Sequence, residues 1–122
     1  MRGIGIRISA DTRGDIVDVT SAQKLIRIVH SLPGTHRGGY VWPHADKSVT
    51  VVSGAVTFYL TDTNTGDEVV RRIEDGDTGF IPRGTAYREF SASGAYFVTL
   101  SKGEGSSEVY EPYRKIVLSH KG

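Results

Sequence analysis

The sequence predicts a single all-β domain, and three observations carry this prediction. Apolar residues recur at every second position in short runs, not at the spacing of a helix. Glycine, proline, asparagine and aspartate separate these runs at intervals of roughly 8–12 residues, as in a β-sandwich or barrel. The chain has 122 residues, a length that suits one hydrophobic core. We therefore expect residues 1–122 to form one domain.

The apolar runs give the expected strands in order. They are residues 4–8, 16–19, 25–29, 49–52, 55–60, 69–73, 78–81, 87–90 and 96–100. A turn at Gly54 is expected to separate two of these strands, because glycine permits tight reversals of the chain. Residues 107–119 are the one segment that favours a helix, although Pro112 within it disfavours a helix interior.

Composition excludes several classes of function. The net charge is +1, with 15 basic and 14 acidic residues, so nothing points to nucleic acid or to an anionic membrane as a partner. The absence of cysteine excludes disulfides, thiolate chemistry and cysteine-bound zinc. The apolar runs fall far short of the ~20 residues of a membrane helix, and no signal-peptide pattern opens the chain. We expect a cytoplasmic protein.

Two segments carry the strongest local signals. Residues 37–47 run into an apolar strand that ends at Gly54. The second segment is defined by the spacing of its glycines and proline, at Gly76, Pro82 and Gly84, with Tyr87 after them. This spacing favours a turn, then a strand, then a sharp reversal of the chain. Together these segments resemble the two motifs of the cupin superfamily. The resemblance implies a cupin jelly roll, or double-stranded β-helix, of about ten or eleven strands.

Typical cupins bind a metal through a His-x-His pair, a glutamate and a histidine from the second motif. The positions of the pair read Tyr40 and Trp42 here, or Trp42 and His44 if the alignment is shifted. The glutamate position reads Asp46 or Lys47, and the last histidine position reads Tyr87.

At most two plausible ligands remain, His44 and Asp46, whereas a stable site usually needs three or four. Lys47 would also oppose a cation. We therefore expect no metal and no cofactor, while convergence of the histidines His30, His36 and His44 in space stays open.

Within the cupins, the chain resembles the dTDP-4-keto-6-deoxyhexose 3,4-ketoisomerases and 3,5-epimerases. The matching segments are residues 11–17, 27–30, 37–38, 47–54 and 98–113. The resemblance implies a metal-independent proton transfer next to the ketone of a nucleotide-linked sugar, in deoxysugar biosynthesis. Such chemistry needs an acid, a base and cationic groups for the enolate and the diphosphate.

The catalytic histidine of these enzymes falls on Tyr40, and the second histidine of the ketoisomerases falls on Trp42. His44 lies two residues further along and is the candidate for a displaced base. The expected catalytic residues are His44, Tyr40, Lys47 and Tyr87, and the expected substrate-binding residues are Arg37, Trp42, His30 and Asp46.

Two other functions stay open from the sequence. The first alternative is a non-catalytic cupin that binds a sugar or another metabolite. The second is a metal-dependent enzyme with atypical ligands. For the assembly, we expect a homodimer, because twofold dimers are the commonest closed assembly and this branch pairs through its sheets.

Overall fold

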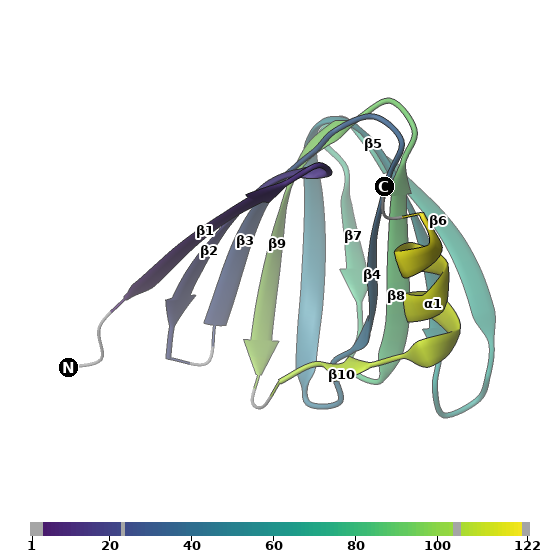
Figure 1. The fold of residues 1–122 in the computed structure, drawn as a ribbon. Helices are drawn as coiled ribbons and strands as arrows, with labels where there is room; N and C mark the ends of the chain where they lie inside the picture. The colour runs from purple at the N-terminus through teal and green to yellow at the C-terminus, as the bar shows by residue number, and fades with distance from the viewer. Residues whose placement is uncertain (1–3, 23, 104–105, 121–122) are drawn as a thin grey trace.

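The structure is a computed structural model that describes residues 4–22, 24–103 and 106–120. These residues form ten strands and one helix (Figure 1). The elements are β1 (Gly5–Asp11), β2 (Gly14–Ser21), β3 (Lys24–Ser31), β4 (Thr35–Val41), β5 (Ala45–Asp62), β6 (Glu68–Glu74), β7 (Thr78–Ile81), β8 (Thr85–Ser91), β9 (Ala95–Gly103), β10 (Glu108–Val109) and α1 (Glu111–Ser119). The all-β prediction is confirmed.

The strands form two antiparallel sheets that share β5. The first sheet has the order β1-β2-β3-β9-β5-β7, and the second has the order β10-β4-β8-β5-β6. The N-terminal part of β5 pairs with β7 and β9, whereas its C-terminal part pairs with β6 and β8. Figure 1 shows the sheets curling into a jelly roll, as the sequence predicts.

The prediction of a turn at Gly54 is wrong, because β5 runs through this position as one bent strand. Its pairing with β9 shifts register between Val51 and Ser53, and Gly54 has a φ of 89°. A side chain here would place its Cβ 2.4 Å from the carbonyl oxygen of Gly94. Glycine therefore permits both the bend and the close approach of the neighbouring turn.

The core lies between the two sheets and is built by the predicted alternation. Along β5, every second residue from Ala45 to Val51 is buried, and β9 alternates in the same way. The largest fully buried side chains of this core are Phe58, Phe97, Val29, Val49, Val51 and Val56, and Val117 is fully buried under the helix α1.

The helix α1 covers the outside of the second sheet and packs mainly on β4 (Figure 1). Pro112 lies in its first turn, where its missing N–H has no helical partner to lose, so the proline starts the helix and does not break it. Gly39 allows the close contact, because a Cβ there would lie 2.5 Å from the Cα of Arg114. No helix in the described parts of the chain is long and apolar enough to span a membrane.

The outer face of the first sheet carries two apolar rows that cross four strands. The strand registers align Ile6, Val19, Ile26 and Leu100 in one row, and Ile8, Val17, Ile28 and Val98 in the next. No residue of β1 is buried on either face, and its two isoleucines, Ile6 and Ile8, are 68% and 72% exposed. We call these eight residues the apolar face.

Candidate functional site

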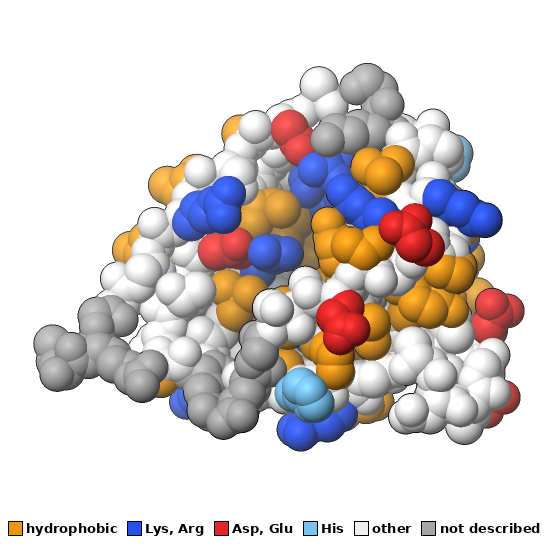
Figure 2. Space-filling model, turned by 60° about the horizontal axis from the view of Figure 1, so that its bottom comes forward, with side chains coloured by type: hydrophobic (Ala, Val, Ile, Leu, Met, Phe, Trp, Pro, Cys, Tyr) orange, Lys and Arg blue, Asp and Glu red, His pale blue; other side chains and the backbone are white. Residues whose placement is uncertain are grey.

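An inner cavity of about 160 Å³ lies between the two sheets. It is lined by Arg13, Ile16, Arg27, Val29, Arg37, Gly38, Tyr40, Tyr87, Glu89 and Arg114. Four of these ten residues are arginines and only one is acidic, so the cavity carries an excess of positive charge. Figure 2 shows the lower end of the molecule hollowed, with Lys, Arg and acidic side chains around hydrophobic ones.

Two of the arginines are neutralised by their own aspartates. The guanidinium of Arg27 donates through Nε and Nη2 to the two carboxylate oxygens of Asp18, at 2.7 and 2.9 Å. Arg13 donates through both Nε and Nη2 to Oδ2 of Asp11, at 3.0 and 2.6 Å, and lowers the pKa of this carboxyl group to about 2. These pairs orient the two arginines but leave little of their charge for a ligand.

Arg37 differs from them, because no carboxylate pairs with it among the described residues. Its side chain points inward from β4, is only 5% exposed, and donates through Nε to Ser31 Oγ at 3.0 Å. Its Nη2 is buried and has no hydrogen-bond partner. Burial lowers the pKa of the Arg37 guanidinium. A buried cation with an idle donor indicates a binding position for an acceptor.

Glu89 lies beside Arg37, since the two residues are paired across β4 and β8. Its carboxylate oxygen Oε2 is buried without a hydrogen-bond partner. Burial raises the pKa of Glu89, and the charges of Lys47 and of the nearby arginines oppose this shift only in part. A carboxylate with a raised pKa is a stronger proton acceptor than an exposed one, as a catalytic base requires.

Tyr87 is adjacent on β8, and Lys47 lies behind it. The Nζ of Lys47 donates to the Tyr87 hydroxyl at 3.1 Å and lies 4.5 Å from the centre of its ring. Both residues are 5% exposed. Because the lysine fills one lone pair of the hydroxyl, the phenolic proton is free to point elsewhere, and Lys47 would stabilise the phenolate left by its loss.

Tyr40 faces Tyr87 across the β4–β8 pairing, and the bulge at Gly38 and Gly39 precedes it. The guanidinium of Arg114 lies 5.0 Å from the Tyr40 ring centre and donates to the carbonyl oxygen of Gly38 at 2.9 Å. The helix α1 therefore contributes the Arg114 side chain to the lining of the cavity. Trp42 packs against the core, with its ring centre 5.9 Å from Lys47 Nζ. The indole Nε1 of Trp42 is buried and has no hydrogen-bond partner among the described residues.

Of the eight residues expected in the site, Arg37, Tyr40 and Tyr87 line the inner cavity, while Lys47 and Trp42 lie beside it without lining it. The other three lie elsewhere. His30 is on the outer face of the first sheet, where its ring stacks on that of Tyr96 with the ring centres 4.2 Å apart. Its Nδ1 lies 3.6 Å from Oδ2 of Asp15. His44 is exposed in the loop between β4 and β5. Asp46 points away from the core, because it neighbours the inward Lys47, and it binds Arg83 at 3.1 Å. None of the three lines the inner cavity.

The arrangement also decides between the two alignments of the metal motif. Tyr40 pairs with Tyr87, and Lys47 points inward beside Trp42, which agrees with the alignment that sets these four residues at the metal-ligand positions of the motif. Indole and ammonium groups cannot ligate a divalent cation, and neutral phenols are poor ligands for it. The described residues contain no cluster of three or more histidine, cysteine or acidic side chains suited to a metal. The donor set does not fit the metal of typical cupins.

Sequence reasoning missed Glu89, Arg27 and Arg13 as site residues. The signal was present for Glu89, because it lies two residues after Tyr87 on one strand and must share its face. A similar signal was present for Arg27, because it lies two residues before the buried Val29 on β3 and shares its face. No such alternation could predict that Arg13 lines the cavity, because Arg13 lies in the turn between β1 and β2.

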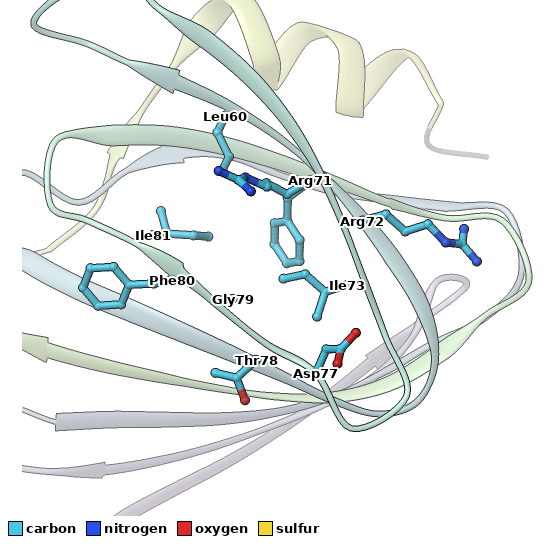
Figure 3. Close-up of a pocket in the computed structure, with 10 residues that line it drawn as sticks. Leu60, Arg71, Arg72, Ile73, Asp77, Thr78, Gly79, Phe80 and Ile81 are labelled. Atoms are coloured by element: carbon cyan, nitrogen blue, oxygen red, sulfur yellow. The ribbon is translucent and has the colours of Figure 1, made fainter.

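A second, larger cavity of about 480 Å³ opens between β6 and β7. Its lining includes the core residues Phe58, Ile73 and Ile81. Figure 3 shows the Arg71 side chain extending toward Leu60, while Arg72 points away. An inward charge on an edge strand is a common protection against edge-to-edge aggregation, and we assign no ligand to this opening.

Comparison with known proteins identifies the fold. No family model and no curated protein sequence matches the chain. Among solved structures, the capsular polysaccharide assembling protein CapF from Staphylococcus aureus superposes with a TM-score of 0.73 at 14% identity, covering 86% of this chain and 31% of that one. Oxalate decarboxylase from Bacillus subtilis gives a TM-score of 0.74 at 16% identity, with coverages of 85% and 30%.

An oxalate oxidase in complex with the substrate analogue glycolate gives a TM-score of 0.63 at 20% identity, covering 71% of this chain and 46% of that one. The chain thus spans about a third to a half of the proteins it resembles. All three belong to the cupin superfamily, and at these identities they establish the cupin fold of this chain.

Proposed function

We propose that this cupin-fold domain is a metal-independent isomerase or epimerase that moves a proton next to the ketone of a nucleotide-linked 4-keto-6-deoxy sugar. One observation carries the proposal: the Glu89 carboxylate and the Tyr87 hydroxyl line one arginine-rich cavity. The similarity to a protein of capsular polysaccharide assembly supports a carbohydrate substrate.

In the proposed reaction, Glu89 acts as the base and Tyr87 as the acid. Glu89 removes a proton from the carbon beside the carbonyl, and the electron pair of the C–H bond moves to the carbonyl oxygen to form an enolate. The Arg37 guanidinium stabilises this negative oxygen. Tyr87 returns a proton to carbon, and the ammonium of Lys47 stabilises its phenolate until solvent restores both groups. Return to the opposite face of the same carbon gives epimerisation.

The size of the cavity limits what enters it. Pockets that enclose drug-sized ligands usually have volumes of about 300–1,000 Å³, and this one has about 160 Å³. The sugar ring is therefore the part we place inside, with the nucleotide outside it. Arg114, which lines the cavity and has no carboxylate partner among the described residues, is our candidate for binding the diphosphate.

Exchange with heavy water tests the proposal. Metal-stripped protein incubated with a dTDP-4-keto-6-deoxy sugar in D₂O should incorporate deuterium next to the ketone, as followed by NMR. Glu89→Gln should reduce this rate by about 100-fold or more, because it removes the base. His44→Ala and the exposed Glu68→Gln should leave it unchanged. Exchange that depends on His44 and not on Glu89 would assign the base to the loop.

The second candidate is a non-catalytic domain that binds a sugar or another metabolite. It is favoured by Tyr40, which replaces the histidine that the resemblance makes catalytic. A titration with dTDP, UDP and GDP, followed by calorimetry and by the fluorescence of Trp42, the single tryptophan, separates the possibilities. Binding without deuterium exchange supports the second candidate, and no binding removes the nucleotide from both.

For the assembly, we propose a homodimer formed through the apolar face of the first sheet. Its two rows present eight apolar side chains on adjacent strands, and among the strands that the structure describes β1 pairs only with β2. Contiguous apolar surface of this kind usually marks an interface. The absence of cysteine agrees with the reducing conditions of the cytoplasm, where we place the protein.

A further inference from the structure

We infer that Ser31 is a positioning residue that keeps Arg37 from pairing with Glu89, so that the cation and the carboxylate stay separate in the inner cavity. The inference rests on the proposed function, in which Glu89 is the base and Arg37 stabilises the enolate. It depends on one buried hydrogen bond, which Arg37 Nε donates to Ser31 Oγ at 3.0 Å.

An ion pair between Arg37 and Glu89 is within reach. The two residues are paired across β4 and β8, and residues opposite each other in antiparallel strands have Cβ atoms about 4.5–5.5 Å apart. Yet no ion pair joins them in the described structure. Arg37 Nη2 and Glu89 Oε2 are each buried without a hydrogen-bond partner. A contact elsewhere therefore holds the guanidinium away from the carboxylate.

Ser31 supplies that contact from the other sheet. It lies on β3, two residues after the buried Val29, so its side chain points inward, and it is 2% exposed. A buried hydroxyl is costly unless it is hydrogen-bonded, and the bond to Arg37 Nε is the one that the described residues give it. We therefore assign to this serine the orientation of Arg37.

The neutrality of the serine matters for both catalytic groups. Arg13 and Arg27 are held by aspartates, whose negative charge offsets theirs. A hydroxyl orients the guanidinium of Arg37 without cancelling its charge. Arg37 therefore keeps its positive charge for the enolate oxygen, and Glu89 keeps an oxygen free for the proton of the substrate.

Loss of the Ser31 hydroxyl should let Arg37 close on Glu89. A forked pair of hydrogen bonds from the guanidinium would stabilise the carboxylate, so the pKa of Glu89 should fall and the base should weaken. The other ionisable groups around Glu89 are unchanged by this substitution, so the comparison isolates Arg37. They are Lys47 on β5, Arg27 on β3, Arg13 in the turn between β1 and β2, Tyr87 on β8, Tyr40 on β4 and Arg114 on α1.

Two measurements on the full chain test the inference. Carbon NMR of the Glu89 carboxyl group should show a lower pKa in Ser31→Ala than in the unmodified protein. Deuterium exchange into a dTDP-4-keto-6-deoxy sugar should be about 10-fold or more slower at neutral pH, and the acidic limb of its pH profile should move to lower pH. The affinity for dTDP should not change.

Two further variants serve as controls. Ser31→Thr, which keeps the hydroxyl, should restore the pKa and the exchange rate. Ser91→Ala removes another buried hydroxyl and should leave both unchanged. Ser91 is also 2% exposed, but its hydroxyl donates to the carbonyl oxygen of Ala55 at 2.9 Å and not to a group of the cavity.

The outcomes separate this inference from the proposed function. If the unmodified protein exchanges deuterium but Ser31→Ala leaves the pKa of Glu89 unchanged, the inference is overturned and the function stands. If the unmodified protein exchanges no deuterium, the function is overturned, while a lowered pKa in Ser31→Ala still supports the separation of the two charges. Should Ser31→Ala fail to fold, as judged by circular dichroism, Ser31→Cys carries the same comparison, because its sulfur is only a weak acceptor.

Discussion

At the scale of single residues, the main feature is Glu89, whose burial disfavours the charged form of its carboxylate. Burial raises the pKa of Glu89 above its ordinary value of 4.5, so between these two values the folded protein binds more protons than the unfolded chain. Stability therefore falls as pH rises through this interval, and the loss is complete above it. Such a cost is common where a side chain is retained for function.

Glu89→Gln should accordingly stabilise the protein at neutral and alkaline pH. We expect a higher melting temperature than that of the unmodified protein at about pH 8, and no gain at about pH 3, where the glutamate is protonated in both states. Differential scanning calorimetry across this range is the measurement. A gain of equal size at both pH values would show that the effect does not come from ionisation.

Individual residues also show which parts of the site can be predicted from the sequence. Motif spacing predicts Arg37, Tyr40 and Tyr87 in one site, and all three line the inner cavity, with Lys47 bound to the Tyr87 hydroxyl beside it. Their roles stay predictions. The place of His44 could not be predicted, since the loop between β4 and β5 interrupts the alternation that would have pointed it inward.

At the scale of elements, the continuity of β5 matters most, because this strand is a member of both sheets. The sequence indicates its two halves and the glycine between them. Whether such a glycine ends a strand or bends it depends on what packs against it, here the carbonyl of Gly94, which lies forty residues further along the chain. Local pattern alone does not contain that contact.

Gly54→Ala should therefore cost more than an alanine at an open glycine. The positive φ costs an L-residue about 1–2 kcal/mol, and the clash with Gly94 adds about 1–3 kcal/mol. Gly66→Ala is the control, since its φ is 81° but nothing lies within 4 Å of its Cβ position. Urea denaturation compares them, and equal losses would contradict the role of the contact.

At the scale of the whole molecule, the sheets have different surroundings. The helix α1 covers part of the outside of the second sheet, whereas the apolar face of the first sheet has no cover among the described residues. The motif resemblance predicts the cupin fold, which the solved structures confirm. That residues 1–122 form one domain, and that two copies associate, stay predictions.

Replacing one exposed isoleucine by a charge tests the association. Ile8→Lys should convert a dimer into a monomer, because it buries a charge in the interface, while ligand binding in the inner cavity should persist. Val70→Lys is the control, since Val70 is 61% exposed on β6, outside the apolar face. Sedimentation equilibrium measures both, and a dimer that survives Ile8→Lys would place the interface elsewhere.

The order of strands has a consequence for how the chain is made. β1, β2 and β3 are synthesised before β9, the strand that completes the edge of β3. Until residues 95–103 have been synthesised, the nascent protein presents a three-stranded sheet with an open hydrogen-bonding edge and apolar residues. Its exposure to aggregation is therefore greater during translation and falls when β9 pairs with β3 and β5.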